Sequence, residues 1–186
     1  MTDPTLDERK RALRAEYPAR LGDPVLGARL AGHVLELVLP AGAVVSGFWP
    51  MGREIDVRPL LLALAGRGHA IALPRTPARG LPLSFHRWRP GDLLEPGRMG
   101  ILQPPPTNEE LAPDVLLVPL VAFDAGMRRL GHGAGYYDRT LAALRARKPV
   151  LAIGIAFAAQ QVDRVPVGPH DGLLDAVATE QGVRPA

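Results

Sequence analysis

The 186-residue chain contains no cysteine, which excludes a disulfide framework, a thiolate metal site and a thiol nucleophile. Lysine is scarce too: Lys10 and Lys148 are the only lysines among 22 basic residues, so the other 20 are arginines. The N-terminus lacks an apolar signal segment, and the most apolar run, 34 to 45, is interrupted by Glu36 and Pro40. Neither secretion nor a membrane-spanning segment is indicated, and we expect a cytoplasmic protein.

The net charge of +3 is not concentrated in one run, because arginines are scattered from Arg9 to Arg184. A nucleic-acid binder usually gathers positive charge on one face, and the sequence contains no helix-turn-helix, zinc-finger or ribonucleoprotein motif. We therefore expect small molecules as partners and no nucleic acid. We also expect no membrane partner and a monomer.

Apolar residues make up 47% of the chain, enough for one domain with its own core. Several short runs are apolar at every position and alternate with segments of helical periodicity, a pattern typical of strands covered on both faces. The predicted fold class is α/β, a single domain over 1–186 with a mostly parallel sheet flanked by helices. The expected strands are 43–48, 70–73, 83–88, 115–118, 150–155 and 174–178.

Helical periodicity predicts a first helix that begins after Thr5, where Glu8 completes the spacing of a capping box, and ends at Pro18. Nine prolines between 74 and 113 break the alternation and predict a small antiparallel insertion with ordered loops. The remaining expected helices are 24–38, 56–66, 136–147 and 158–163.

The stretch RRLGHGAGYYDR, residues 128–139, places Gly131, Gly133 and Gly135 directly before a predicted helix. Glycine adopts positive φ and lets the backbone approach a ligand closely, while a helix N-terminus offers free N–H groups and the positive end of its dipole. A phosphate chain fits these conditions. A flexible loop with a glycine-permitted helix entry fits the same pattern when it is taken alone.

Charged residues flank this loop. Arg128 and Arg129 could neutralise a phosphate chain, and Asp138 could hold a Mg²⁺ ion that bridges its oxygens. The loop is neither a Walker loop, since Gly-Lys followed by Ser or Thr is absent, nor a Rossmann fingerprint, since 123–129 separate the glycines from the preceding strand.

The segment VPLVAFDAGMRRLGHGAGYYDR, residues 118–139, resembles the signature of the 5-formyltetrahydrofolate cyclo-ligase family, whose members are also called methenyltetrahydrofolate synthetases. The similarity extends over nearly the whole chain in the family's order. The other matching segments are KRALR at 10–14, GFWPMGREIDVRPLL at 47–61, IALPR at 71–75, GILQPP at 100–105 and GPHDGLLDAVATEQGV at 168–183. The resemblance implies conversion of 5-formyltetrahydrofolate and ATP to 5,10-methenyltetrahydrofolate, ADP and phosphate, with magnesium, through an N5-iminium phosphate.

The resemblance also implies site residues. For the folate, Trp49 and Glu54 occupy the matching positions, with Asp56 as the competing carboxylate and Met99 as a looser match. Catalytic roles are expected for Arg129, His132 and Tyr136, and His132, Gly133, Ala134, Gly135 and Tyr136 should also line the folate side. The expected ATP-binding residues are Lys10, Arg11, Arg14, Arg129, Leu130, Gly131, His132, Gly133, Ala134, Gly135, Tyr136 and Tyr137.

Magnesium is expected at Asp138 and Asp171, with Asp175 as the second choice for the latter position. Two loop residues depart from the family pattern. His132 stands where many relatives have Tyr or Arg, and Ala134 stands where they have Gly or Lys. A Lys at position 134 would place a cation on the γ-phosphate, so this chain must supply another, such as a charged His132 or the flanking arginines.

Three hypotheses follow. The first is the ATP-dependent cyclo-ligase. The second is a non-catalytic relative that binds nucleotide or folate without turnover, which the intact loop residues disfavour. The third is arginine-mediated RNA binding, whose affinity would fall steeply with salt.

Overall fold

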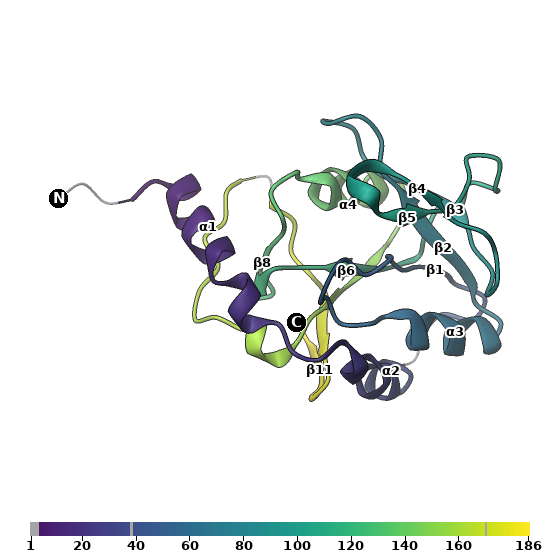
Figure 1. The fold of residues 1–186 in the computed structure, drawn as a ribbon, viewed down its shortest axis with the longest axis horizontal. Helices are drawn as coiled ribbons and strands as arrows, with labels where there is room; N and C mark the ends of the chain where they lie inside the picture. The colour runs from purple at the N-terminus through teal and green to yellow at the C-terminus, as the bar shows by residue number, and fades with distance from the viewer. Residues whose placement is uncertain (1–3, 38, 170) are drawn as a thin grey trace.

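The computed structural model describes residues 4–37, 39–169 and 171–186. Within these ranges the centre is a seven-stranded sheet in the order β11-β10-β9-β6-β1-β2-β3 (Figure 1). Its five inner strands are parallel, and the outer strands β3 and β11 run antiparallel to their neighbours. The strands are β1 (Val44–Ser46), β2 (Ala70–Arg75), β3 (Ser84–Arg87), β6 (Val115–Pro119), β9 (Leu151–Ile155), β10 (Ala176–Thr179) and β11 (Gly182–Pro185).

Helices cover both faces of this sheet (Figure 1). α2 (Gly27–Val34) and α3 (Arg58–Gly66) pack on one face, and α4 (Tyr136–Arg145) packs on the other. Successive side chains of a strand point to opposite faces, and β6 shows this directly. Leu117 belongs to the cluster that contains the α2 and α3 leucines, whereas Leu116 and Val118 pack with Leu141 of α4. The uninterrupted apolar runs of the sequence are explained by burial on both faces.

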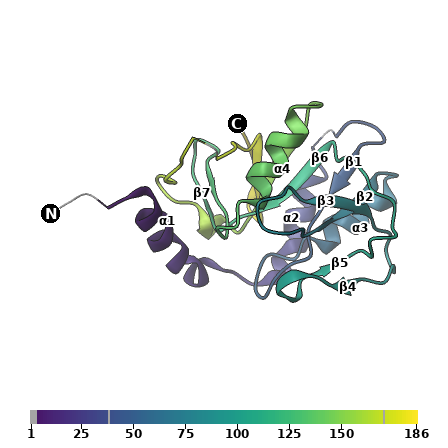
Figure 2. The ribbon, with the colours of Figure 1, turned by 90° about the horizontal axis from the view of Figure 1, so that it is seen from above.

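α1 (Leu6–Ala15) projects from the body in both views (Figures 1 and 2) and contains no buried residue. The expected capping box is present, with Thr5 and Glu8 exchanging side-chain and backbone hydrogen bonds. The helix ends at Ala15, and Pro18 lies in the following 3-10 helix, η1 (Tyr17–Arg20). None of the helices in the described ranges is long and apolar enough to cross a membrane.

The proline-rich stretch forms the expected antiparallel insertion. β3 pairs with β2, and β4 (Glu95–Pro96) pairs with β5 (Leu102–Gln103) in a small separate hairpin. An ion pair of 2.7 Å between Arg75 of β2 and Glu95 ties this hairpin to the main sheet. A third small sheet, β7 (Ala122–Phe123) with β8 (Arg129–Leu130), leads into the glycine loop.

The α/β fold class with a mostly parallel sheet is confirmed, and several boundaries were wrong. The helix expected at 24–38 is divided into a short 3-10 helix, η2 (Pro24–Leu26), and α2, which ends at Val34; its predicted last residue, Val38, lies outside the described residues. The helix expected at 158–163 is only one 3-10 turn, η4 (Ala158–Gln160). The two-residue strands β4, β5, β7 and β8 were not predicted, because two residues are too few to show a period, and the edge strand β11 was not predicted either.

Candidate active site

A cavity of about 340 Å³ lies at the carboxyl ends of the parallel strands β1, β2 and β6. Phe48 and Trp49 follow β1, Thr76 follows β2, and Pro119 ends β6, and all four line the cavity. The chain runs from β1 to β2 on one side and returns to β6 on the other side of β1. The cavity therefore lies where the strand order reverses, the position at which open α/β sheets bind ligands.

The first-choice site residues that the resemblance implies all line this one cavity, with the exception of Arg11. Arg11 is exposed on α1 and is not among the lining residues. The structure thus brings together residues from α1, the segment after β1, the glycine loop, α4 and the segment near 171. The roles that the resemblance assigns to them stay predictions.

The glycine loop enters α4 as the sequence predicted, with the helix beginning at Tyr136. Gly133 has a φ of 107° and Gly135, the N-cap, a φ of 66°, conformations that favour glycine. The N-cap has no side-chain hydrogen bond to the first turn of α4. The first amides of the helix thus have no side-chain cap from this residue, the arrangement that helix N-termini offer to anions.

Arg129 lies beneath this loop, with only 6% of its surface exposed. Its Nη2 donates to Asp138 Oδ1 over 2.7 Å, and its Nη1 donates to the Gly172 carbonyl over 2.5 Å. These two bonds fix a guanidinium at the cavity wall. Arg128 differs from the expectation: its guanidinium lies 2.9 Å from Asp124, and it does not line the cavity. Its pairing with Asp124 explains why only one of the two adjacent arginines can reach a ligand there.

α1 contributes two cations to the cavity. Arg14 Nε donates to the Gly131 carbonyl over 2.9 Å, and Lys10 Nζ lies 2.6 Å from Asp171 Oδ2. The two side chains lie one turn apart on the same helical face, as the sequence predicted. Arg11, directly after Lys10, lies on a different face of the helix and does not line the cavity.

On the other side of the cavity, Glu54 is a buried carboxylate with 7% of its surface exposed. Its Oε2 accepts the Met51 N–H over 2.8 Å, and its Oε1 lies 3.1 Å from Nε2 of His132. Burial, and next the negative charge of Glu54, raise the pKa of the Tyr17 and Tyr137 phenols well above the ordinary value. Both tyrosines therefore stay neutral beside this carboxylate.

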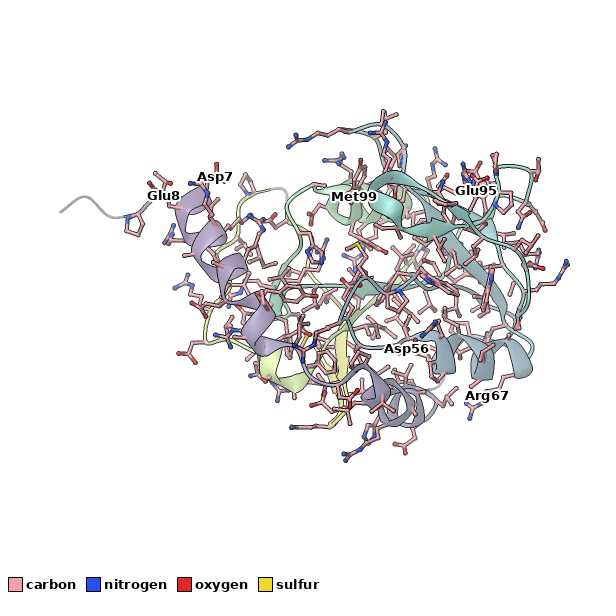
Figure 3. The ribbon with its side chains drawn as sticks, viewed as in Figure 1. Asp7, Glu8, Asp56, Arg67, Glu95 and Met99 are labelled. Atoms are coloured by element: carbon pink, nitrogen blue, oxygen red, sulfur yellow. The ribbon has the colours of Figure 1, made fainter. Side chains whose placement is uncertain are left out.

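Asp56, the alternative folate carboxylate, lies partly buried beside the start of α3 (Figure 3). It accepts both the backbone N–H and the guanidinium of Arg58, the latter over 2.7 Å, and it does not line the cavity. Partial burial raises the pKa of Asp56, but the hydrogen bonds from Arg58 outweigh this effect and the pKa is lowered. Arg58 also lies 5.4 Å from the ring centroid of Trp49, which meets Trp88 edge-on. Asp56 thus serves the start of α3, one residue before the N-cap Val57.

The two expected metal ligands both line the cavity. Asp138 uses Oδ1 to accept Arg129 and the Gly172 N–H, and Asp171 uses Oδ2 to accept Lys10 and the Gly168 N–H. Among the residues described, the second oxygen of each carboxylate has no hydrogen bond. Within the same ranges no group of three His, Cys, Asp or Glu side chains could hold a metal. Two carboxylates at one cavity are a donor set that fits Mg²⁺, which takes one or two carboxylates and completes its shell with phosphate and water oxygens.

Asp175 lies away from the cavity. Its Oδ2 accepts the N–H of Ala152 at the amino end of β9 and is paired with Arg145 over 2.7 Å. Because ligands meet the carboxyl ends of the strands, this position leaves Asp171 as the carboxylate that faces the cavity.

Some lining residues were not predicted, among them Asp7, Met51, Thr76, Leu83 and Ile101. Thr76 could have been found, since it directly follows an apolar strand. Leu83 and Ile101 come from the insertion, whose path over the cavity has no local signal. Met99, a looser expectation, also lines the cavity; it is 77% exposed and has a φ of 57° in the turn between β4 and β5 (Figure 3).

These features define a class: an α/β protein whose cavity at a sheet switch point has a glycine-rich loop at a helix N-terminus on one side and a buried carboxylate on the other. The model of the 5-formyltetrahydrofolate cyclo-ligase family matches residues 5–180. The chain belongs to the 5-formyltetrahydrofolate cyclo-ligase family, as the resemblance of its motifs predicted.

Individual relatives agree with this assignment. A 5-formyltetrahydrofolate cyclo-ligase of Mycolicibacterium smegmatis is 37% identical over 75% of this chain and 74% of its own length. The protein of that name from Escherichia coli strain K12 is 33% identical over 95% of this chain and 97% of its own length. The NMR structure of Aquifex aeolicus 5,10-methenyltetrahydrofolate synthetase superposes with a TM-score of 0.76 at 29% identity, covering 95% of this chain and 92% of that one.

Proposed function

We propose that this protein converts 5-formyltetrahydrofolate to 5,10-methenyltetrahydrofolate at the expense of ATP, with Mg²⁺, and releases ADP and phosphate. One observation carries the proposal: a single cavity joins the glycine loop, which suits a triphosphate, to the buried Glu54, which suits a ligand rich in N–H donors. Family membership supports the same activity.

The proposed reaction has two steps. First, the formyl oxygen of the substrate attacks the γ-phosphorus of ATP, a new O–P bond forms, and ADP leaves with the electrons of the bond that breaks. The resulting N5-iminium phosphate carries phosphate as a competent leaving group. Second, N10 attacks the formyl carbon and gives up its proton, and the C–O bond to phosphate breaks to yield the methenyl product.

The nucleotide side relies on positioning and charge stabilisation, which dominate phosphoryl transfer. The loop amides and the start of α4 would hold the phosphate oxygens, and Arg129 would stabilise the charge that develops on the transferring group. Lys10 and Arg14 reach the same cavity from α1. Their present partners are Asp171 and the Gly131 carbonyl, and both cations would turn to the phosphates of the nucleotide.

The folate side relies on recognition and orientation. Glu54 would accept hydrogen bonds from the amino and ring N–H groups of the pterin, and Trp49 would pack on its flat face. The Tyr136 hydroxyl donates to the Pro77 carbonyl over 3.2 Å, which anchors its ring at the cavity. Holding N10 beside the activated carbon would supply much of the acceleration of the second step.

Asp138 and Asp171 would hold the Mg²⁺ through the carboxylate oxygens that accept no hydrogen bond from the described part of the chain. When bound, the ion would neutralise charge on the phosphate oxygens. That the protein is a monomer and works in the cytoplasm stays a prediction.

The test is an activity assay with a matched pair of carboxylate variants. The protein, 5-formyltetrahydrofolate, ATP and Mg²⁺ should yield the near-ultraviolet absorbance of the methenyl product and one phosphate per turnover. Glu54→Ala should raise the KM for the folate at least tenfold, because the pterin loses a charged hydrogen-bond partner worth about 1.5–3 kcal/mol. Asp56→Ala, two residues away but outside the cavity, should leave that KM within about twofold.

Absence of any product with folded wild-type protein would contradict the proposed function. Tight binding of folate or ATP without product would identify the non-catalytic relative instead. If Asp56→Ala raised the KM for the folate and Glu54→Ala did not, the assignment of the folate carboxylate would be wrong.

A further inference from the structure

His132 occupies an unusual place in the cavity, because it bridges the nucleotide side to the folate side. It belongs to the glycine loop, yet its Nε2 lies 3.1 Å from Oε1 of Glu54. An ionised carboxylate only accepts hydrogen bonds, so this contact requires a proton on Nε2 of the imidazole. The ring of Tyr17 holds the imidazole from another side, with centroids 5.3 Å apart at 81°.

The Glu54 carboxylate depends on this contact. Its Oε2 is held by a backbone N–H, and in the described part of the chain Oε1 has His132 as its hydrogen-bond partner. A buried carboxylate oxygen without a donor is costly. Without a ligand, His132 supplies that donor.

The same contact must break when a ligand with N–H donors reaches Glu54. His132 can move, because its side chain is 42% exposed and its neighbours in sequence are Gly131 and Gly133. A Cβ on Gly131 would meet nothing within 4 Å, so the loop has room on that side. Glu54 has no comparable freedom, since it is buried and tied to the Met51 N–H.

We propose that His132 is a placeholder: it satisfies the Glu54 carboxylate in the ligand-free protein and is displaced when the N–H donors of the folate take that oxygen. This inference rests on the proposed function, because it takes the folate as the ligand of Glu54. The proposal and the alternative, a direct contact between His132 and the folate, predict opposite changes in folate affinity when the His132 side chain is removed. Removal of a contact weakens folate binding, whereas removal of a placeholder strengthens it.

The first test measures binding of 5-formyltetrahydrofolate by calorimetry without ATP or Mg²⁺, for the wild type and for His132→Leu. The placeholder predicts that His132→Leu binds about three- to tenfold more tightly, since no hydrogen bond to a charged group has to be exchanged. Thermal unfolding checks that the variant is folded. Unchanged or weaker binding by the folded variant overturns the inference, as does absence of binding by the wild type, whereas the proposed function is judged separately by product formation in the activity assay.

The second test uses pH and His132→Gln, which keeps an N–H donor but cannot become charged. An imidazolium holds a carboxylate more strongly than a neutral imidazole does, and imidazole changes charge between about pH 5 and 8. Wild-type affinity for the folate should therefore fall about fivefold more than that of His132→Gln between pH 8 and pH 6. Equal pH dependence of the two proteins overturns the inference even if His132→Leu does not fold.

Other groups around His132 cannot mimic this result. Tyr17 from η1 and Tyr137 from α4 stay neutral, because burial and next the Glu54 charge raise the pKa of both phenols. Arg14 from α1, at the Gly131 carbonyl, keeps its charge throughout this pH range. Lys10 and Asp171 line the same cavity as an ion pair and are present in both proteins. The comparison between wild type and His132→Gln isolates the imidazole.

Discussion

The shape of the glycine loop can be tested by placing one methyl group at each of two neighbouring glycines. Gly133 has a φ of 107°, which an L side chain rarely adopts, and a Cβ there would lie 3.4 Å from Cζ of Arg14. Gly131 lies outside the positive-φ set, and its Cβ would meet nothing within 4 Å. The two substitutions add the same atoms to the same loop, but only one forces the backbone into strain.

Backbone strain of this kind costs about 1–3 kcal/mol. Gly133→Ala should therefore lower the free energy of unfolding by about 1–3 kcal/mol, while Gly131→Ala should leave it unchanged or raise it by about 0.4–1 kcal/mol through the lower entropy of the unfolded chain. Urea unfolding of the ligand-free proteins measures both values.

If the loop of Gly133→Ala instead relaxes into another backbone conformation, the cost should appear as weaker ATP binding. A cost of about 1–3 kcal/mol corresponds to a rise of about 5- to 150-fold in the KM for ATP of Gly133→Ala. Equal unfolding free energies for the two variants, together with a wild-type KM for ATP in Gly133→Ala, would refute the reasoning that positive φ shapes the phosphate loop.

Two further outcomes concern stability. A Cβ on Gly27 would overlap the carbonyl oxygen of Asp56, so Gly27→Ala should lower the free energy of unfolding by at least about 2 kcal/mol. Gly32→Ala in the same helix should raise it by about 0.5–1 kcal/mol, because a Cβ there meets nothing within 4 Å. Urea unfolding that ranked the two variants equally would contradict the close contact at Gly27. Burial raises the pKa of Asp124, but three backbone N–H groups and Arg128 outweigh it and the folded-state pKa is lowered. The ionised carboxylate therefore stabilises the fold above its unfolded pKa of about 3.9, and this stabilisation is lost as pH falls through the lower folded-state pKa. Asp124→Asn should destabilise most at pH 7, with a gap to the wild type that narrows below about pH 4; a gap independent of pH would show that Asp124 acts without its charge.

Local patterns predicted much of the fold. The central strand β6 and the start of α4 lie within one residue of their predicted positions, because a buried run and a glycine-to-helix junction are signals carried by adjacent residues. β11 was missed because its residues, GVRP, include a single apolar side chain that packs on the core, Val183. An edge strand is specified by its partner more than by its own composition.

The residues of the candidate site were likewise predicted in part from the sequence. The glycine loop, the two cations of α1 and Glu54 were all named from the sequence and line one cavity. The local sequence pattern could not decide between residues of the same type that lie close together in the chain. Arg128 and Arg129 are adjacent, yet Asp124 takes the former out of the site, and Asp175 is four residues from Asp171 but lies at the other end of the sheet.

The α/β class, the glycine-shaped entry to α4 and the order of the family's motifs can be read from the amino-acid sequence, since each depends on neighbouring residues and on backbone freedom at single positions. Which charges meet depends on the folded arrangement of the chain. Lys10 and Asp171 are separated by 161 positions and His132 and Glu54 by 78, so no local periodicity relates them. Their distances are set by the strand order, which places the ends of β1, β2 and β6 around one cavity and buries a carboxylate against the loop that faces it.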